Sequence, residues 1–183
     1  MARIPPATGE LDPLAQAEVD RQMAAHGRIT NMKRTLAHSG AALVALMTWY
    51  PLRDTVAEFL GDRATTLFAH AVSTETECLI CSTFFRRILK DAGEDPDALV
   101  LDARERVIVN YGLALARNNS YVPDATYASV AAILNPREIV ALTAFGGMMI
   151  ATNVFNNALD VDLDDYLHTY KRAGGVEPDA AEA

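Results

Sequence analysis

The sequence predicts an all-α protein. The pattern of apolar residues is helical along nearly the whole chain, and no stretch of alternating β-branched residues bounded by turn signals is present. Glycine and proline stand where helices are expected to stop. With 183 residues, half of them hydrophobic and 22% charged, the chain suits one domain of ordinary size that buries its own core.

The N-terminal part predicts three helices. A proline-rich arm leads into a helix over residues 13–26, which Gly27 ends. A second helix is expected over 33–49 and ends at the Tyr50-Pro51 step, because a residue before proline disfavours the helical conformation. A short third helix covers 52–60. We therefore divide the chain into an arm and helix at 1–26 and a main helical domain at 27–172.

The rest of the chain predicts five or six further helices. One covers about 63–72, and the next carries both cysteines and runs to Asp91, where Ala92-Gly93 stops it. Beyond the EDPD turn, helices are expected at 103–117, 124–133 and 136–159, with a last one at 162–172. Residues 173–183 form an acidic tail that is expected to fray.

Charge and composition exclude several classes of partner. The net charge of −8 disfavours nucleic-acid and anionic-membrane surfaces, because phosphate binding needs clustered Lys and Arg. The start MARIPPATGELDP lacks an apolar signal core, which favours a cytoplasmic protein. The uncharged run at 139–155 is shorter than a comfortable membrane span, so it predicts a buried helix. Within it, Gly146-Gly147 predicts the close approach of another helix.

The stretch TETECLICSTFF holds both cysteines of the chain, Cys78 and Cys81. Thr74-x-x-Glu77 matches a capping box, with Ser73 and Thr76 as rival N-caps. Any of these places Cys78 in or near the first turn of a helix, where free backbone N–H groups and the helix dipole favour a thiolate.

Cys81 lies one turn further along the same helix face, so the two sulfurs can approach closely enough for a disulfide. This arrangement favours redox chemistry, with the outer Cys78 attacking and the inner Cys81 resolving. Two alternatives remain, since the cysteines can also be small buried hydrophobes or half of a metal site. A closed zinc site needs four ligands, and the four histidines show no paired ligand spacing, so no metal and no cofactor are expected. The histidines are His26, His38, His70 and His168.

Four segments together resemble the carboxymuconolactone decarboxylase and AhpD-like alkylhydroperoxidase family, in particular its peroxidase-related branch. They are GRITNMKRTLAHSGAALVALMTWY, the dithiol ECLIC before a helix, LDARERVIVNYGLALAR, and LNPREIVALTAFGGMMIATNVFNNALDVDLD. The resemblance covers about 27–164. It implies an AhpD-like helical fold that assembles as an obligate homo-oligomer, a dimer, trimer or hexamer.

The resemblance also implies an activity. In the AhpD branch the dithiol reduces hydroperoxides and is recharged by a dithiol partner such as a lipoyl protein. Carried over to this chain, Cys81 matches the peroxidatic cysteine and Cys78 the resolving one. This order is the reverse of the one that the helix dipole favours, and both orders stay open.

Two positions depart from the family pattern. The histidine expected four residues after the second cysteine is Phe85, and the glutamate expected twelve residues before the first is Thr66. These groups would take the thiol proton, so the usual base and its partner are both missing. His70, Glu75 and Glu77 are the substitutes, and the predicted catalytic set is Cys78, Cys81, His70 and Glu77.

A group of polar residues stands near the end of the long helix: Asn153, Asn156, Asn157 and Asp160. Of these, Asn153, Asn157 and Asp160 share one face. They either hydrogen-bond the helix end or a neighbouring subunit, or they line a pocket near the dithiol. His38 is a further candidate for that pocket.

Three functions follow from these observations. The first is a cytoplasmic, cofactor-free thiol peroxidase whose substrate is an organic hydroperoxide. The second is a lyase or isomerase that acts on a lactone or small organic acid, with incidental cysteines. The third is a non-catalytic helical oligomer in which Phe84 and Phe85 fill a former active site.

Overall fold

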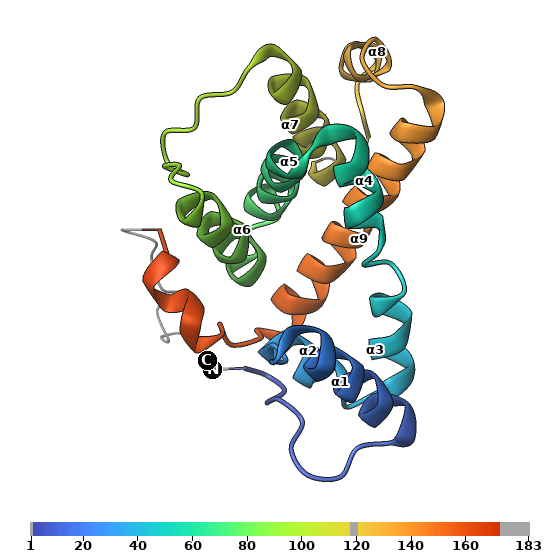
Figure 1. The fold of residues 1–183 in the computed structure, drawn as a ribbon, viewed down its shortest axis with the longest axis vertical. Coiled ribbons are helices and arrows are strands. Elements are labelled where there is room, and N and C mark those ends of the chain that lie inside the picture. Colours follow the sequence, from blue (N-terminus) through green and yellow to red (C-terminus); the bar gives the residue numbers. More distant parts are fainter. Residues whose placement is uncertain (1, 118–120, 173–183) are drawn as a thin grey trace.

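The computed structural model describes residues 2–117 and 121–172, and within these ranges the protein consists of helices and loops with no strand. The helices of the described residues are, in chain order (Figure 1), α1 Pro13–His26, α2 Asn31–Leu36, α3 Gly40–Met47, α4 Leu52–Leu60, α5 Asp62–Glu75, α6 Leu79–Asp91, α7 Ala103–Ala116, α8 Asp124–Ala131, α9 Pro136–Leu159 and the 3₁₀ helix η2 Asp165–Tyr170. The all-α prediction is confirmed.

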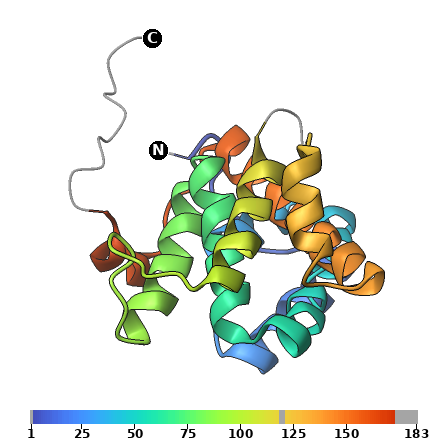
Figure 2. The ribbon, with the colours of Figure 1, turned by 90° about the horizontal axis from the view of Figure 1, so that it is seen from above.

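The long helix α9 connects the two parts of the molecule. It packs against α4, α5 and α7, and its last turns approach the group formed by α1, α2 and α3 (Figure 1). Seen from above, α5, α6 and α7 lie side by side, and α8 packs against α7 (Figure 2). At the centre, the Phe68 ring of α5 stacks on the Phe145 ring of α9 with 5.8 Å between centroids.

Local sequence signals explain where several helices begin. Asp12 caps α1 by accepting hydrogen bonds from the backbone N–H groups of Leu14 and Ala15. A reciprocal capping box, Asn135 with Glu138, begins α9. The predicted ranges 13–26, 52–60 and 136–159 agree with the observed helices, because proline, glycine and capping residues mark their ends.

The predicted helix over 33–49 is wrong, because this stretch forms two helices. Ser39 caps the start of α3, and the backbone N–H of Gly40 donates to the Asp12 carboxylate at 2.9 Å. A Cβ at position 40 would lie 2.3 Å from the other oxygen of that carboxylate, Oδ1. The contact with α1 therefore breaks the helix at a glycine, and the sequence pattern alone does not reveal it.

The two ends of the chain differ in what the structure shows. Ala7 of the arm and Ala15 of α1 both belong to the buried core, so the arm and α1 pack against the rest of the fold. The predicted helix at 162–172 is a 3₁₀ helix over Asp165–Tyr170 that packs on α6. The tail at 173–183 lies outside the described residues.

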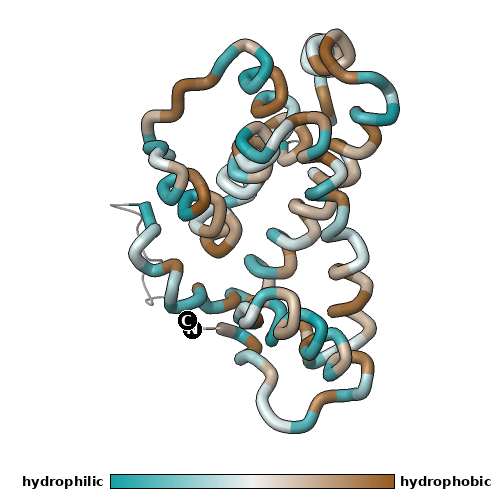
Figure 3. Tube along the Cα trace, viewed as in Figure 1, coloured by the Kyte–Doolittle hydropathy of each residue, from teal (hydrophilic) through white to brown (hydrophobic). Residues whose placement is uncertain are grey.

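Within the described residues, α9 is the one helix long and apolar enough to cross a membrane by length and composition. A core helix passes the same test, and 44% of the apolar window of α9 is buried inside the protein. Polar residues gather in its last turns, at the end nearest α2 (Figure 3). The compartment stays a prediction.

The Gly146-Gly147 pair yields a paired test of close packing. A Cβ on Gly146 would meet Leu115 Cδ1 at 2.8 Å and Phe68 Cζ at 3.1 Å, whereas a Cβ on Gly147 would meet nothing nearer than Trp49 at 3.9 Å. We expect Gly146→Ala to lower the free energy of unfolding by about 1–3 kcal/mol through overpacking.

The matched control is Gly147→Ala, which adds the same methyl group one residue further along α9. Alanine favours the helix, so this variant is expected to be unchanged or more stable by up to about 1 kcal/mol. Urea unfolding of both variants measures the difference. Equal stabilities would contradict the close approach at Gly146.

Candidate active site

Cys78 lies in the turn that joins α5 to α6. The backbone N–H of Cys78 donates to the Ser73 carbonyl at 3.0 Å, and that of Glu77 donates to the Thr74 carbonyl at 3.1 Å. Glu77 has a left-handed conformation, with φ 53°. These are the two hydrogen bonds and the left-handed residue of a Schellman motif, which ends α5.

The same turn begins α6, since Cys78 is its N-cap residue and makes no capping hydrogen bond with its side chain. The predicted capping box is therefore wrong: Thr74 lies in the last turn of α5, and Glu77 points into solvent. The cysteine pair still stands at the start of a helix, as expected. The Schellman motif places it there.

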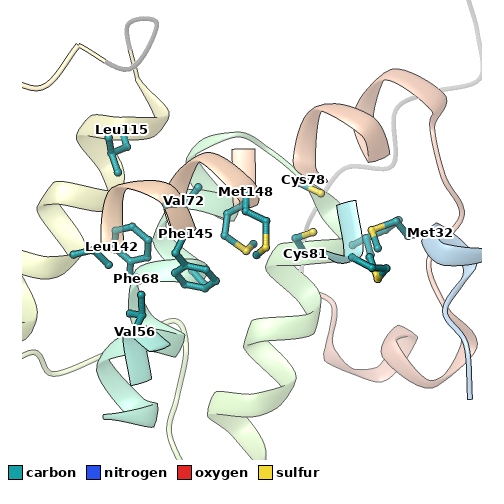
Figure 4. Close-up of a cluster of buried hydrophobic side chains, with 14 of the residues drawn as sticks. Met32, Val56, Phe68, Val72, Cys78, Cys81, Leu115, Leu142, Phe145 and Met148 are labelled. Atoms are coloured by element: carbon teal, nitrogen blue, oxygen red, sulfur yellow. The ribbon is translucent and has the colours of Figure 1, made fainter. Parts of the chain in front are cut away.

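Both cysteines are free thiols in the core (Figure 4). Cys78 is fully buried and Cys81 is 8% exposed. Figure 4 shows the two sulfurs between Met148 on α9 and Met32 on α2. The pair therefore lies where α6 contacts α9, among the apolar side chains of one buried cluster that also contains Met32 of α2.

Asn156, in the last turns of α9, contacts both sulfurs. Its Nδ2 lies 3.6 Å from Cys78 Sγ and 3.4 Å from Cys81 Sγ. Two neighbouring asparagines hold the turn before the dithiol: Asn153 donates to Thr76 Oγ1 at 2.7 Å, and Asn157 donates to the Thr76 carbonyl at 2.8 Å. Three amides of α9 thus fix the turn and the sulfurs together.

These contacts extend the interpretation of the asparagines. Asn153 and Asn157 lie beside the turn before the dithiol, whereas Asn156, which lies off the face they share, touches the sulfurs themselves. Sequence reasoning missed this role. The signal in the sequence was the group Asn153, Asn156 and Asn157 at the end of an otherwise apolar helix, where polar side chains spaced about one turn apart can bind a neighbouring segment.

The two thiols differ in acidity. The pKa of Cys78 falls to about 7, because the Cys81 thiol donates a hydrogen bond to its sulfur and because backbone N–H groups at the helix start and the Asn156 amide donate as well. Burial opposes this shift. The pKa of Cys81 is raised, since that thiol donates to Cys78, is buried, and lies beside the Cys78 charge. Cys78 is accordingly the more acidic thiol of the pair.

His70 lies half-buried on α5, near an ion pair. Its pKa is lowered to about 4, chiefly by burial and then by the Arg86 charge, while the Asp97 charge opposes the shift. Arg86 itself forms two hydrogen bonds with Asp97, at 2.9 and 2.7 Å. Among the described residues, no hydrogen bond joins His70 to either sulfur. Its role as a proton relay stays a prediction, as does that of Glu77.

The other sequence candidates lie as follows. Glu75 pairs with Arg117 at 2.6 Å, and the His38 ring faces the Pro5 carbonyl at 3.0 Å, which ties it to the N-terminal arm. Thr66 is buried in α5. Phe85 meets the Phe84 ring edge to face with 5.3 Å between centroids, and both rings pack against the core cluster.

The structure also bears on ligand sites away from the dithiol. In residues 2–117 and 121–172 no group of three His, Cys, Asp or Glu side chains is placed to hold a metal ion. One cavity of about 200 Å³ lies beside Arg63 and Glu94, and another of about 160 Å³ lies between α4 and the start of α9. Neither cavity borders a cysteine.

Comparison with solved structures identifies the fold. The apo debrominase Bmp8 superposes with a TM-score of 0.76 at 13% identity, covering 91% of this chain and 95% of the other. An AhpD-core, peroxidase-related protein from Ralstonia eutropha JMP134 superposes with a TM-score of 0.71 at 15% identity, covering 90% and 94%. A peroxidase-related protein from Silicibacter sp. TM1040 gives 0.68 at 18% identity, covering 88% and 90%.

The chain has the AhpD-like fold. The resemblance read from the sequence is confirmed at this level. No protein-family model matches the sequence, and no curated protein matches it. The AhpD-like arrangement is thus preserved at 12–18% identity to these structures.

Replacement of Asn156 tests the assignment of the thiolate. In Asn156→Ala the amide no longer donates to Cys78, so we expect the Cys78 pKa to rise from about 7 toward its ordinary value. Thiolate absorbance at 240 nm against pH measures this without requiring a reagent to reach the buried sulfur. Less thiolate is then expected at pH 7.

Asn157→Ala is the matched control, because it removes the same group one residue away without touching a sulfur. Its thiolate titration should coincide with that of the parent protein. An unchanged titration in Asn156→Ala would show that Asn156 does not stabilise the thiolate.

Proposed function

We propose that the protein is a thiol–disulfide oxidoreductase that reduces organic hydroperoxides through Cys78 and Cys81. The observation that supports this best is the Asn156 amide, whose nitrogen lies within 3.6 Å of both sulfurs and helps to lower the pKa of Cys78. A dithiol of this kind needs one more acidic cysteine as the nucleophile and one less acidic cysteine as the resolving group.

In the first step the Cys78 thiolate attacks one peroxide oxygen. An S–O bond forms and the O–O bond breaks, so Cys78 becomes a sulfenic acid and the released alkoxide takes a proton to give the alcohol. In the second step Cys81 loses its proton and attacks the Cys78 sulfur. The disulfide forms, hydroxide leaves as water, and two electrons have passed from the dithiol to the peroxide.

This order assigns the attack to Cys78 and resolution to Cys81. Cys78 is the more acidic thiol, since it lies at the start of α6 and accepts hydrogen bonds from Cys81 and Asn156. Cys81 stays protonated until it is needed, because its pKa is raised. The acidity of the pair thus supports the order that the helix dipole favours over the order that the family resemblance implies.

The surroundings of the dithiol favour an organic substrate over a small polar one. The sulfurs lie in an apolar cluster, and Met32, Ile80 and Met148 belong to it. Leu79, next to Cys78, is 52% exposed and is an apolar group at the surface above the dithiol. A dithiol reductant such as a lipoyl-bearing protein completes the cycle, and assembly as a homo-oligomer is part of the proposal.

Stoichiometric oxidation tests this function. Cumene hydroperoxide should remove two thiols per chain at neutral pH and release cumyl alcohol in equal amount. Cys78→Ser should form neither sulfenic acid nor disulfide, whereas Cys81→Ser should stop at a sulfenic acid on Cys78. Thiol titration and mass spectrometry measure these products. Survival of both thiols in excess peroxide would rule the proposal out.

The same variants separate the alternatives. A lyase or isomerase with incidental cysteines keeps its activity in the double serine variant, whereas a peroxidase does not. A non-catalytic oligomer with a filled site keeps both thiols in peroxide and turns over neither a peroxide nor a lactone.

Reductive debromination is a second candidate, because two of the matching structures are of a debrominase. One of them is a cysteine-to-alanine variant in complex with 2,3,4-tribromopyrrole, with a TM-score of 0.75 at 12% identity. A dithiol can supply the two electrons: an aryl bromide and two thiols give the dehalogenated arene, a disulfide and hydrogen bromide.

Bromide release distinguishes this reaction from the first. With 2,3,4-tribromopyrrole and a dithiol reductant, the debrominase function predicts one bromide per disulfide formed, and the peroxidase function predicts none. Ion chromatography measures bromide, with the Cys78→Ser variant as the control. Equal bromide from both proteins would exclude debromination by the dithiol.

A further inference from the structure

An unpaired hydrogen-bond acceptor lies beside the dithiol. Asn156 is 3% exposed, and its Oδ1 is buried with no hydrogen-bond partner among the described residues. The Nδ2 atom of the same amide lies 3.6 Å from Cys78 Sγ and 3.4 Å from Cys81 Sγ. Buried polar atoms are seldom left without a partner, so the unpaired oxygen indicates a donor that joins the site during the reaction.

This oxygen differs from the other unpaired polar atoms in the described part of the core. Those atoms are Thr35 Oγ1, Ser73 Oγ, Arg87 Nε and Asn153 Oδ1. Asn153 lies one turn before Asn156 on α9, and its amide donates to Thr76 Oγ1 at 2.7 Å instead of to a sulfur. Asn156 therefore combines an unpaired acceptor with a contact to the reacting atoms.

The chemistry of the sulfurs determines which end of the amide faces them. A thiolate accepts hydrogen bonds and donates none, so the NH2 end of Asn156 faces the sulfurs and its oxygen is left for another donor. Two contacts hold this part of α9 in place: Asn153 donates to Thr76 Oγ1, and Asn157 donates to the Thr76 carbonyl at 2.8 Å. The oxygen is thus a fixed acceptor next to the nucleophile.

A partner for this oxygen must carry an N–H or O–H group. A hydroperoxide carries one such group, the O–H on its terminal oxygen, which is the oxygen that a thiolate attacks. The sulfenic acid that results keeps this O–H on the oxygen bound to sulfur. One acceptor beside Cys78 can therefore hold both the substrate and the intermediate, whereas a peroxide with two alkyl groups offers it no donor.

The acceptor and the dithiol lie close to the surface. Leu79, next to Cys78, is 52% exposed, and Asn157, next to Asn156, is exposed as well. Cys81 itself is 8% exposed. The path from solvent to the sulfurs and the amide oxygen is therefore short.

We propose that Asn156 Oδ1 accepts the O–H of the hydroperoxide and keeps this hydrogen bond in the Cys78 sulfenic acid. Asn156 is then a catalytic residue that touches the nucleophile with one end of its amide and the substrate with the other, which aligns the reacting oxygen with the sulfur. This inference rests on the proposed redox function of Cys78 and Cys81. It deepens that function, because it restricts the substrates to peroxides with a free O–H.

Atoms and electrons balance over the two steps. The Cys78 thiolate attacks the terminal oxygen, an S–O bond forms, the O–O bond breaks, and the alkoxide takes a proton from solvent. The hydrogen on the transferred oxygen stays there and keeps its bond to Asn156. Cys81 then attacks Cys78 Sγ, the S–O bond breaks, and the proton of Cys81 goes to the departing hydroxide to give water. Two electrons have passed from the dithiol to the peroxide.

Two oxidants separate the role of the amide oxygen from that of the Nδ2 donor. Cumene hydroperoxide carries an O–H, whereas diamide carries no O–H or N–H group, and Cys78 must be ionised to attack either of them. We define the oxidant ratio as the rate constant for cumene hydroperoxide divided by that for diamide at one pH. A change in the pKa of Cys78 slows both reactions equally and cancels in this ratio. Single-turnover thiol loss at low oxidant concentration measures both rate constants.

Asn156→Leu keeps the approximate shape of the side chain and removes the acceptor. Its oxidant ratio should fall about tenfold, which is what one hydrogen bond contributes to a rate constant. Asn156→Asp restores an acceptor oxygen without the NH2 group, so its ratio should return to the parent value although both reactions slow. The control is Asn110→Leu, the same replacement at an exposed position of α7, which should keep the parent ratio.

The outcomes distinguish this inference from the proposed function. An unchanged ratio in Asn156→Leu, in a protein that reduces the hydroperoxide, overturns the role of the oxygen and leaves the peroxidase function intact. A lowered ratio that Asn156→Asp does not restore also overturns it, because the loss then comes from packing. Survival of the parent thiols in cumene hydroperoxide overturns both. Asn156→Ala takes the place of Asn156→Leu if the latter does not fold.

Discussion

A thiolate in a protein core is stable only if hydrogen-bond donors replace the water that it has lost. Cys78 is fully buried, and its donors come from three places: the Cys81 thiol, the backbone N–H groups at the start of α6, and the Asn156 amide. Removing the sulfur from the helix start would lose the backbone donors, and moving α9 would lose the amide. The geometry of the site is therefore fixed by the requirement to solvate one sulfur.

The rest of the fold contributes to the hydrogen bonding of this sulfur through α9, which carries Asn156. Its asparagines reach the sulfurs and the turn before them only because the helix passes close to α5 and α7, and Gly146 permits that approach beside Phe68 and Leu115. The stacked rings of Phe68 and Phe145 fix how far α9 is shifted along α5. Packing near the middle of α9 thus sets the position of an amide three turns away.

Much of the fold could be predicted from the sequence, because its signals are local. Proline at 136, glycine at 27 and 93, and the polar caps at 12 and 135 mark helix ends through backbone geometry. The Cys-x-x-Cys was correctly predicted to stand at a helix start, although the capping box used to predict this is wrong. The Schellman motif was not, since it needs a left-handed conformation that glutamate rarely adopts.

The composition of the site was less predictable, because it depends on contacts between residues far apart in the chain. Asn156 meets sulfurs 75 and 78 positions earlier, and nothing in the local pattern around it indicates that contact. Phe85 and Thr66 stand where the resembled family has a histidine and a glutamate, and the local sequence does not indicate which side chains lie beside the dithiol instead.

The capping position of Cys78 also has a consequence for redox balance. The donors at the start of α6 hold a charge that exists in the dithiol and vanishes in the disulfide, so they stabilise the reduced form alone. A dithiol stabilised in this way has a higher reduction potential than an unperturbed pair. For the proposed redox function, this means a disulfide that a dithiol partner reduces readily.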